Sequence, residues 1–388
     1  MDTHVDLAKL RSISLAAAVV GLIACAVGLT LDKDAFAVSW LIGWTYWFYP
    51  TLGALGWLMI YHLTSGRWGY VMQRPLEAAA RLMPLMLILF IPVLFSTHAL
   101  YEWTHEHAIA TDKLIQHKIS YLNTGGYTKR MFVYFAVWIA LAFVISGISR
   151  RDDANNNPDA VKRMRFYAAP GLVAFALAAT FASFDWLMSL EPHWFSSIYG
   201  AIFMVAGGLS CMLFMAVLLN SLSSREPLKG VITAQQFHDI GNWCFAFTIL
   251  WTYMNFSQFI IIWSGNLYEE TFWYLHRSKG GWVEVVTIMA LALFAIPFVL
   301  LLFKANKRNP AVLAKIALPV LMFRVLEVYW LIGPTFRKEA LAVHWMDLAA
   351  LVGIGGLWLF MFTLGLNKVP FLSGDARFQE FAKGEAGH

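Results

Sequence analysis

The sequence predicts an all-α integral membrane protein with ten transmembrane helices, arranged as two four-helix bundles flanked by one helix at each end of the chain. Of the 388 residues, 59% are apolar and only 14% are charged, and the mean hydropathy is +0.59. A soluble domain of this composition could not cover itself with polar surface. A spanning helix needs about 20 largely apolar residues. The composition therefore excludes a soluble enzyme with a few membrane anchors.

Ten apolar runs, bounded by charged residues, proline and glycine, are each long enough to cross a bilayer. They lie at 12–31, 38–62, 82–101, 131–149, 166–187, 194–220, 239–263, 282–303, 316–333 and 344–366. The first run precedes Ala35-Phe36-Ala37, which resembles a signal-peptidase site, but it is long for a signal core and leads straight into another span. We expect a retained helix there, and we expect Gly355-Gly356 in the last run to allow close helix packing.

Basic residues are distributed unevenly between the connections. Nineteen of the 29 lysines and arginines lie on the side of the amino terminus and nine on the opposite side, while Arg324 lies inside a span. Cytoplasmic connections of membrane proteins carry the excess of lysine and arginine. Both termini are therefore expected in the cytoplasm, and the chain is expected to be one membrane domain with a cytoplasmic tail at 367–388.

The sequence lacks the ligand patterns of common redox cofactors. Cys25, Cys211 and Cys244 lie far apart inside apolar runs, without a Cys-x-x-Cys or haem-attachment motif. We expect these cysteines to be buried small apolar side chains. His62 and His98 lie at opposite ends of their spans and could not ligate one haem iron, so no cofactor or metal is expected in this chain. No basic stretch carries stacking aromatics, so nucleic acid is not an expected partner.

Two segments of the chain resemble each other. In 47–55 and 194–202 the Trp, Phe, Gly and Ala residues match in register, and Pro75-Leu76 and Pro227-Leu228 follow in the next connections. The match suggests a duplicated four-helix unit with unchanged orientation, spans 2–5 (about 38–187) and spans 6–9 (194–333), flanked by spans 1 and 10. Chance similarity between two aromatic-rich helix starts is the alternative.

Two charged residues, Arg324 and Glu327, lie near the middle of the ninth span. Ionisable groups at this depth are costly and normally face a bundle interior, a partner or water. Three residues apart, the two share one helical face, so pairing lowers the cost of each. The sequence leaves open whether they form a structural ion pair or a proton relay.

Further ionisable residues gather at the ends of the spans. A carboxylate and a histidine in a partly dehydrated site can exchange protons near neutral pH, although the same residues also serve as helix caps at an interface. The outer candidates are His98, Asp185, Glu191, His193, Glu284, His344 and Asp347, and the inner ones are His62, Glu77, His238 and Asp239. A proton route across the membrane would need an inner entry, the pair in the ninth span and an outer exit.

The segment 184–200, Phe-Asp-Trp-Leu-Met-Ser-Leu-Glu-Pro-His-Trp-Phe-Ser-Ser-Ile-Tyr-Gly, resembles the signature of the ActF-type membrane subunits of bacterial alternative complex III. These subunits belong to the NrfD/polysulfide-reductase membrane-subunit family. Shorter stretches at 49–56, 117–123 and 237–242 are also similar. The likeness extends over nearly the whole chain.

The resemblance implies a ten-helix subunit of a quinol:electron acceptor oxidoreductase in the bacterial inner membrane. The implied partners are a sister ten-helix NrfD-like subunit, an iron–sulfur protein, multihaem c-type cytochrome subunits and often a haem-copper oxidase. Haem c, iron–sulfur clusters and quinol are then expected in those partners, while this subunit has no redox centre and helps to conduct protons. On the matching segment, Asp185, Glu191 and His193 inherit an outer proton role.

The leading hypothesis is therefore a membrane subunit of a quinol-oxidising complex that contributes to proton conduction and assembly. One alternative is a passive scaffold that anchors soluble subunits through the outer connection at 102–130. Another is a secondary transporter, which predicts helices broken at mid-span in corresponding repeats. In the ninth span Pro319 lies near one end and Gly333-Pro334 at the other, a placement that does not favour a transporter.

Overall fold

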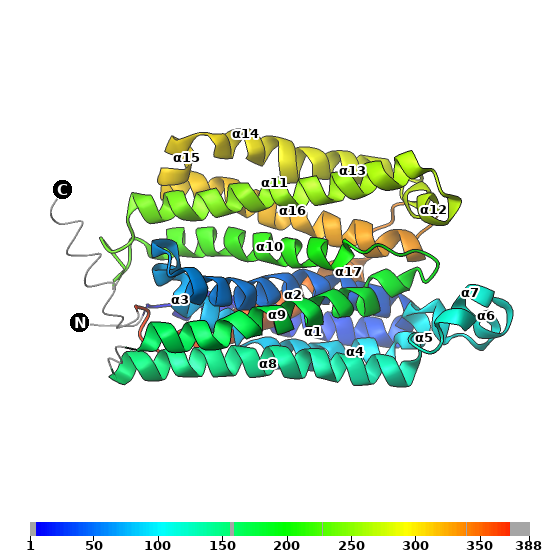
Figure 1. Cartoon of the computed structure of the whole chain (residues 1–388), viewed down its shortest axis with the longest axis horizontal. Helices are drawn as coiled ribbons and strands as arrows, with labels where there is room; N and C mark the ends of the chain where they lie inside the picture. The colour runs from blue at the N-terminus through cyan, green and yellow to red at the C-terminus, as the bar shows by residue number, and fades with distance from the viewer. Residues whose placement is uncertain (1–4, 156–158, 227, 339, 373–388) are drawn as a thin grey trace.

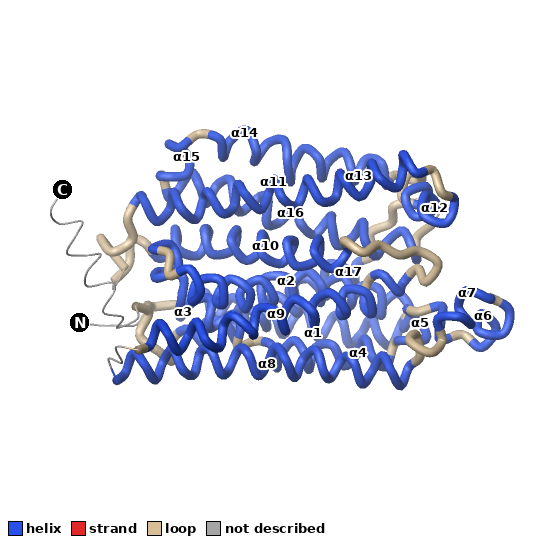
Figure 2. Tube along the Cα trace, in the orientation of Figure 1, coloured by secondary structure: helices blue, strands red, loops and turns tan. Residues whose placement is uncertain are grey.

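The computed structural model of the chain describes residues 5–155, 159–226, 228–338 and 340–372 (Figure 1). Within these ranges the chain is helical apart from short connections and contains no strand (Figure 2). The helical class predicted from the sequence is confirmed. Pro227 and residues 373–388 of the expected tail lie outside the described residues.

The long helices run nearly parallel to one another (Figure 1). They are α1 (Ala8–Leu31), α2 (Lys33–Thr64), α8 (Thr124–Asn155), α9 (Ala160–Trp186), α10 (Tyr199–Leu222), α11 (Ala234–Gly265), α16 (Pro310–Phe336) and α17 (Trp345–Leu366). Two further crossings are composite: α3 (Arg67–Ala80) continues into α4 (Met83–Phe95), and α13 (Trp282–Met289) continues through a π-helical turn (Ala290–Ala295) into α14 (Ile296–Leu302). Short helices occupy the connections: α5 (Thr97–Leu100), α6 (Glu106–Thr111), α7 (Lys113–Lys118), α12 (Tyr268–His276) and α15 (Lys304–Arg308).

Successive crossings alternate in direction, so the connections collect at two ends. We call the end with the start of α1 and the end of α17 the terminal face. The opposite end, which carries α5, α6, α7 and α12, is the distal face (Figure 1). Every ionisable residue that the sequence predicted to lie in an outer layer belongs to a segment at the distal face.

Eight helical stretches in the described part of the chain are long and apolar enough to cross a membrane, so the chain is a membrane protein. The second and ninth predicted spans form the continuous helices α2 and α16, which are not among those eight. The count of ten spans therefore stays a prediction. Between the second and third predicted spans, residues 67–80 form the buried helix α3, which continues into the third crossing.

α2 is the central helix of the fold. It packs against α4 and α9 on one side and against α10, α16 and α17 on the other. Glycine allows the closest of these approaches: a Cβ atom at Gly53 would lie 2.1 Å from the carbonyl oxygen of Gly207 in α10. Trp57 strengthens the same contact, because its indole Nε1 donates to the carbonyl oxygen of Gly208 at 2.9 Å.

The remaining helices pack around α2 and α10 in two similar sets. In the first set α4 contacts α8, and α8 contacts α9, which returns to α2. In the second set α10 contacts α11 and α16, α11 contacts α14, and α13 contacts α16. α17 covers α2, and α1 lies on α17.

Small residues allow α1 and α17 to pack closely. A Cβ atom at Gly356 would lie 2.3 Å from the backbone nitrogen of Ala18, and one at Gly21 would lie 2.3 Å from the nitrogen of Gly353. The close packing predicted from Gly355-Gly356 is confirmed at this interface. Burial of all three cysteines is confirmed as well.

The two segments that resemble each other do not occupy equivalent positions. Trp47 lies in the middle of α2, whereas Trp194 precedes the start of α10. Gly53 approaches Gly207, whereas the aligned Gly200 lies in the first turn of α10 and approaches Thr180 of α9. Any repeat must therefore be argued from the order of helix packing and not from this match.

Candidate functional site

The central charged pair lies on α16 and faces α10 and α11. Arg324 is fully buried and Glu327 is 2% exposed. Nη2 of Arg324 donates to Oε2 of Glu327, and Nε donates to the Ser210 hydroxyl of α10 at 2.7 Å. Trp251 Nε1 of α11 donates to the other glutamate oxygen, Oε1, at 2.5 Å. The predicted pairing is confirmed, and it holds three helices together at mid-bundle.

Aromatic rings supply the rest of the environment of Arg324. Its guanidinium carbon lies 5.5 Å from the ring centroid of Trp251 and 5.9 Å from that of Tyr49 in α2. Such faces attract a cation electrostatically. Nη1 of Arg324 is nevertheless buried without a hydrogen-bond partner. The arginine is therefore held by one carboxylate, one hydroxyl and two rings, so the loss of Glu327 would leave its charge largely uncompensated.

A small cavity lies on the distal side of this pair. It measures about 10 Å³, and its lining includes Tyr49, Tyr199, Asn255 and Gln258. A cavity of this size accommodates about one water molecule where polar partners are present. Gln258 continues the polar contacts, because its Nε2 donates to the Tyr274 hydroxyl at 3.0 Å and its Oε1 accepts from Ser196 at 2.7 Å.

Glu191 lies at the distal end of the same region. Its Oε1 accepts from Arg277 Nη1 at 2.7 Å and from the Thr335 hydroxyl at 2.9 Å, and His276 Nδ1 lies 3.8 Å from Oε2. Burial lowers the pKa of Arg277, and the charge of Glu191 opposes that shift. The guanidinium also stacks on Trp273, with 3.7 Å between its carbon and the ring centroid.

Asp185 is the second carboxylate of the distal face. It is fully buried at the end of α9 and accepts from Nε and Nη2 of Arg130 at 2.8 and 2.9 Å. Tyr134 donates to the same carboxylate at 2.8 Å. A bidentate arginine contact of this kind is strong and geometrically specific, and it joins α8 to α9.

Asp347 is the third, and it caps α17. Its Oδ2 accepts from the backbone nitrogen of His344 at 2.8 Å, while His344 Nδ1 accepts from the nitrogen of Met346 at 3.3 Å. Arg337 donates from Nη1 and Nη2 at 2.8 and 3.0 Å, and the Ser39 hydroxyl donates at 2.6 Å. The pair His344 and Asp347 therefore forms a capping box that also fixes the preceding loop.

The other distal candidates lie closer to the surface. His193 Nε2 lies 2.5 Å from Oδ2 of Asp112, the residue that caps α7, and this contact lowers the pKa of Asp112. His98 is exposed beside His105, whose Nε2 bonds to the His98 carbonyl at 2.7 Å. Glu284 is exposed in the first turn of α13. The structure does not bring these groups into the buried cluster.

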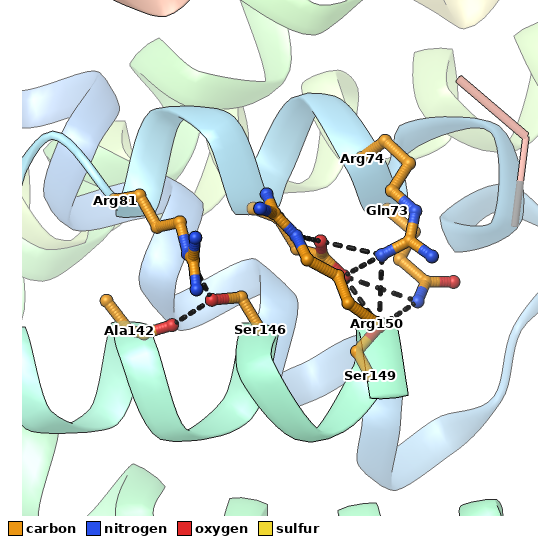
Figure 3. A network of polar contacts seen from close by, with 8 residues as sticks. Gln73, Arg74, Arg81, Ala142, Ser146, Ser149 and Arg150 are labelled. Atoms are coloured by element: carbon orange, nitrogen blue, oxygen red, sulfur yellow. Dashed lines mark hydrogen bonds and ion pairs between the residues drawn. The ribbon is translucent and has the colours of Figure 1, made fainter. Parts of the chain in front are cut away.

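A separate ion cluster lies near the terminal face, between α3 and α8 (Figure 3). Glu77 is fully buried and accepts from Arg74 Nη1 at 2.7 Å, from Arg150 Nε at 3.1 Å and from the Ser149 hydroxyl at 2.6 Å. Gln73 donates to the same hydroxyl at 2.7 Å. These contacts fasten α3 to α8.

The remaining residues predicted for the inner layer lie elsewhere at the terminal face. His238 and Asp239 are partly buried at the start of α11, where Nδ1 of the histidine lies 3.9 Å from the aspartate. His62 is buried near the end of α2.

Sequence reasoning missed the arginines that pair with the buried carboxylates. Arg130, Arg150, Arg277 and Arg337 lie between the predicted spans, yet each contacts a carboxylate, which is buried in three cases and partly buried in that of Glu191. The spacing of Arg74 and Glu77, three residues apart, was a usable signal. The other arginines are distant in sequence from their carboxylates, so spacing does not predict those pairs.

Comparison of the chain with known protein families finds no match, and neither does comparison with curated proteins. Within the described residues, no three His, Cys, Asp or Glu side chains come together in a group that could hold a metal ion. The functional conclusion therefore depends on the geometry of the polar groups themselves.

Proposed function

We propose that the chain is a membrane subunit of a quinol-oxidising respiratory complex, without a redox centre of its own, in which Glu327 exchanges a proton with the distal face. The observation that carries this proposal is the buried carboxylate of Glu327 at mid-bundle, paired with Arg324, whose guanidinium carbon lies 5.9 Å from the ring centroid of Tyr49, a residue that lines the small cavity. A carboxylate buried at such depth is expensive. Its energetic cost favours a functional role over a purely structural one.

The order of helix packing supports the ten-helix, two-bundle architecture. The first set, α2, α4, α8 and α9, is connected in the same cyclic order as the second set, α10, α11, α13–α14 and α16. α2 and α10 pack against each other where the two sets meet. The charged pair on α16 lies beside this junction, because Arg324 contacts Ser210 of α10 and the ring of Tyr49 of α2.

The proposed path runs from Glu327 toward the distal face. Hydroxyl and water oxygens both donate and accept hydrogen bonds, so they can pass a proton along a chain. The tyrosines and Asn255 and Gln258 line a cavity large enough for about one water molecule. Beyond it, Glu191 and Arg277 form the exit near the surface.

Packed aromatic rings of α2, α3 and α11 lie on the terminal side of the charged pair. Trp57 packs at 5.4 Å from Trp68, at 4.8 Å from Trp243 and at 4.7 Å from Phe247, measured between ring centroids. Apolar rings offer no proton carriers. We therefore propose a half-path that connects Glu327 with the distal face, which the charge distribution assigns to the outside of the inner membrane.

Asp185 and Asp347 have structural roles in this proposal. Each accepts two hydrogen bonds from one arginine, a geometry that is strong and fixes the orientation of the carboxylate. They fix the distal ends of α9 and α17 and the loop that precedes α17. The proposed partners, a sister NrfD-like subunit, an iron–sulfur protein and multihaem cytochromes, would dock on the protruding distal segments α5 to α7 (Figure 1).

The experiment compares proton release per quinol oxidised in the purified native complex reconstituted into liposomes. The variant R324M/E327Q removes the titrating group without leaving an unpaired buried charge. Proton release should fall while quinol oxidation and the haem spectrum of the partners stay unchanged. Gly356→Ala serves as control, because it perturbs the α1–α17 contact far from the path. Unchanged proton stoichiometry in the double variant would leave the passive scaffold as the better description.

A further inference from the structure

A large cavity opens between α11 and α13, beside α12 and α16. Its volume is about 460 Å³, within the range of sites that bind small organic ligands. Phe256, Trp263 and Val283 line it with 61%, 51% and 50% of their surfaces exposed. These apolar residues belong to helices long and apolar enough to cross a membrane, so the mouth faces the bilayer and a ligand would enter from the lipid.

The local backbone explains why the helices leave this space. Pro297 lacks a backbone N–H, and its ring crowds the carbonyl of the residue four positions earlier. The preceding turn, Ala290–Ala295, widens into a π-helix, a form that is frequent at functional sites. Ala290 is small, and it lines the cavity at the point where this turn begins.

The walls of the cavity are largely aromatic. The aromatic lining consists of Trp251, Phe256, Phe259, Trp263, Tyr274, Phe294 and Trp330. Flat rings of this kind pack favourably against another planar ring, edge to face or offset. A saturated acyl chain would gain no such geometric preference from them.

The polar groups of the lining are neutral or already paired. Arg277 is the one charged residue in the lining. It donates to Glu191, to the carbonyl oxygens of Trp273 and Leu331 and, through Nε, to that of Trp330. Arg277 is therefore not available to bind an anionic phosphate headgroup. Asn255 and Tyr274 remain as neutral partners for a ligand.

Tyr274 is well suited to donate a hydrogen bond. Its hydroxyl accepts from Gln258 at 3.0 Å, which leaves its own hydrogen available to an occupant. Burial raises the pKa of Tyr274 to about 12. The hydroxyl therefore stays protonated at neutral pH.

We propose that this cavity binds a lipid-soluble ligand with a neutral, planar, hydrogen-bonding ring and an apolar tail, the chemistry of quinones and quinols. The choice of quinones and quinols among such ligands rests on the proposed function. The ring would pack among the aromatic walls with an oxygen at Tyr274 or Asn255, and the tail would leave through the mouth toward the lipid. Trp251 is shared by the two sites, because its ring lines the cavity and its Nε1 donates to Glu327.

Photoaffinity labelling tests this inference. The full-length chain in phosphatidylcholine nanodiscs would be exposed to an azido-substituted benzoquinone with a decyl tail, illuminated, and mapped by peptide mass spectrometry. Labelling is expected on peptides from 251–263 and 283–294. Decyl benzoquinone without the azide should displace the probe, whereas oleyl alcohol at the same concentration should not.

Two variants and one control locate the ligand. Ala290→Trp fills the cavity and should abolish the labelling. Ile288→Trp adds the same ring at a position that is 44% exposed on α13 and does not line the cavity, and it should label as the parent does. Tyr274→Phe removes one hydrogen bond and should weaken binding by about two- to tenfold.

Three results would overturn the inference. They are labelling spread evenly over lipid-facing helices, labelling that survives Ala290→Trp, and displacement by oleyl alcohol as effective as by decyl benzoquinone, which would identify a general acyl-chain groove. The assay needs neither turnover nor partner chains. A negative result would therefore leave the proton path through Glu327 untouched, and unchanged proton stoichiometry would leave the binding result intact.

Discussion

Replacing Glu327 with glutamine should destabilise the protein strongly, although the two side chains have nearly the same volume. The glutamine amide could still accept from the Trp251 indole, but the charge that compensates Arg324 would be gone. Breaking a buried ion pair by removing one partner costs about 3–5 kcal/mol. The upper part of this range is expected, because Nη1 of Arg324 already lacks a hydrogen-bond partner.

The double variant R324M/E327Q should recover most of that loss. Methionine fills the space of the arginine stem, so no charge stays buried, and Ser210 retains its hydrogen bond to the carbonyl oxygen of Ala206 at 2.8 Å. Replacing a buried pair by uncharged groups is often close to neutral. One unsatisfied amide group costs about 1–3 kcal/mol, and the double variant should lie within that range of the parent.

The assay is equilibrium unfolding in mixed micelles by SDS, followed by circular dichroism for the parent, the two single variants and the double variant. The double variant should lose much less free energy of unfolding than the two single variants lose together. Additive losses within about 0.5 kcal/mol would show that the two side chains are energetically independent. A loss below about 1 kcal/mol for Glu327→Gln would show that Arg324 is solvated or otherwise compensated. Either result refutes this account of the site.

Three further predictions concern other parts of the fold. Gly356→Ala should lower the free energy of unfolding by about 1–3 kcal/mol through overpacking, whereas Gly147→Ala, with open space around the new Cβ, should raise it by about 0.5–1 kcal/mol. Thermal unfolding should therefore shift the melting temperatures of the two variants in opposite directions. A rise for Gly356→Ala would show that the α1–α17 contact is not tightly packed. Asp185→Asn should cost about 2 kcal/mol, since charged hydrogen bonds are lost, and should leave proton release unchanged; a fall in proton release at parental stability would make Asp185 a relay. The contact between Asp112 and His193 lowers the pKa of the aspartate, so its stabilisation is present above the ordinary pKa of about 3.9 and is lost as the pH falls through the lowered value. Hydrogen exchange of α7 should be independent of pH near neutrality, after correction for intrinsic rates, and should rise below about pH 3.9; loss of protection already at pH 6 would show that Asp112 does not control this stability.

The sequence was sufficient to predict the class of fold and the depth of most residues. Apolar runs mark helices that cross a membrane, and alternating direction then assigns Asp185, Glu191 and Asp347 to one end without any coordinates. Helix bounds were predicted less well, since α8 and α11 continue beyond their apolar runs. A helical backbone needs no apolar side chains, so hydropathy marks the membrane-embedded part and not the whole helix.

The pairing of the buried charges could be predicted only where both partners lie on one helix. Arg324 and Glu327 are three residues apart, and their contact follows from helical geometry. Arg130 and Asp185 are 55 residues apart, and Glu191 and Arg277 are 86 apart. The helix faces that pack together determine the arginine partner of each carboxylate. A single sequence does not show how the helix faces pack, so it does not predict these pairs.

The sequence by itself therefore determined that this protein is helical and membrane-embedded, that its cysteines are buried, and that its ionisable residues form layers. The tertiary structure decided that Asp185 and Asp347 are held by arginines, that Glu327 is paired with Arg324 and Trp251 at mid-bundle, and that a large cavity lies between α11 and α13. The physical reason is the range of the forces involved. Hydrophobic burial acts through local composition along each helix, whereas a hydrogen bond, including one within an ion pair, needs its donor and acceptor about 3 Å apart and therefore depends on helix packing.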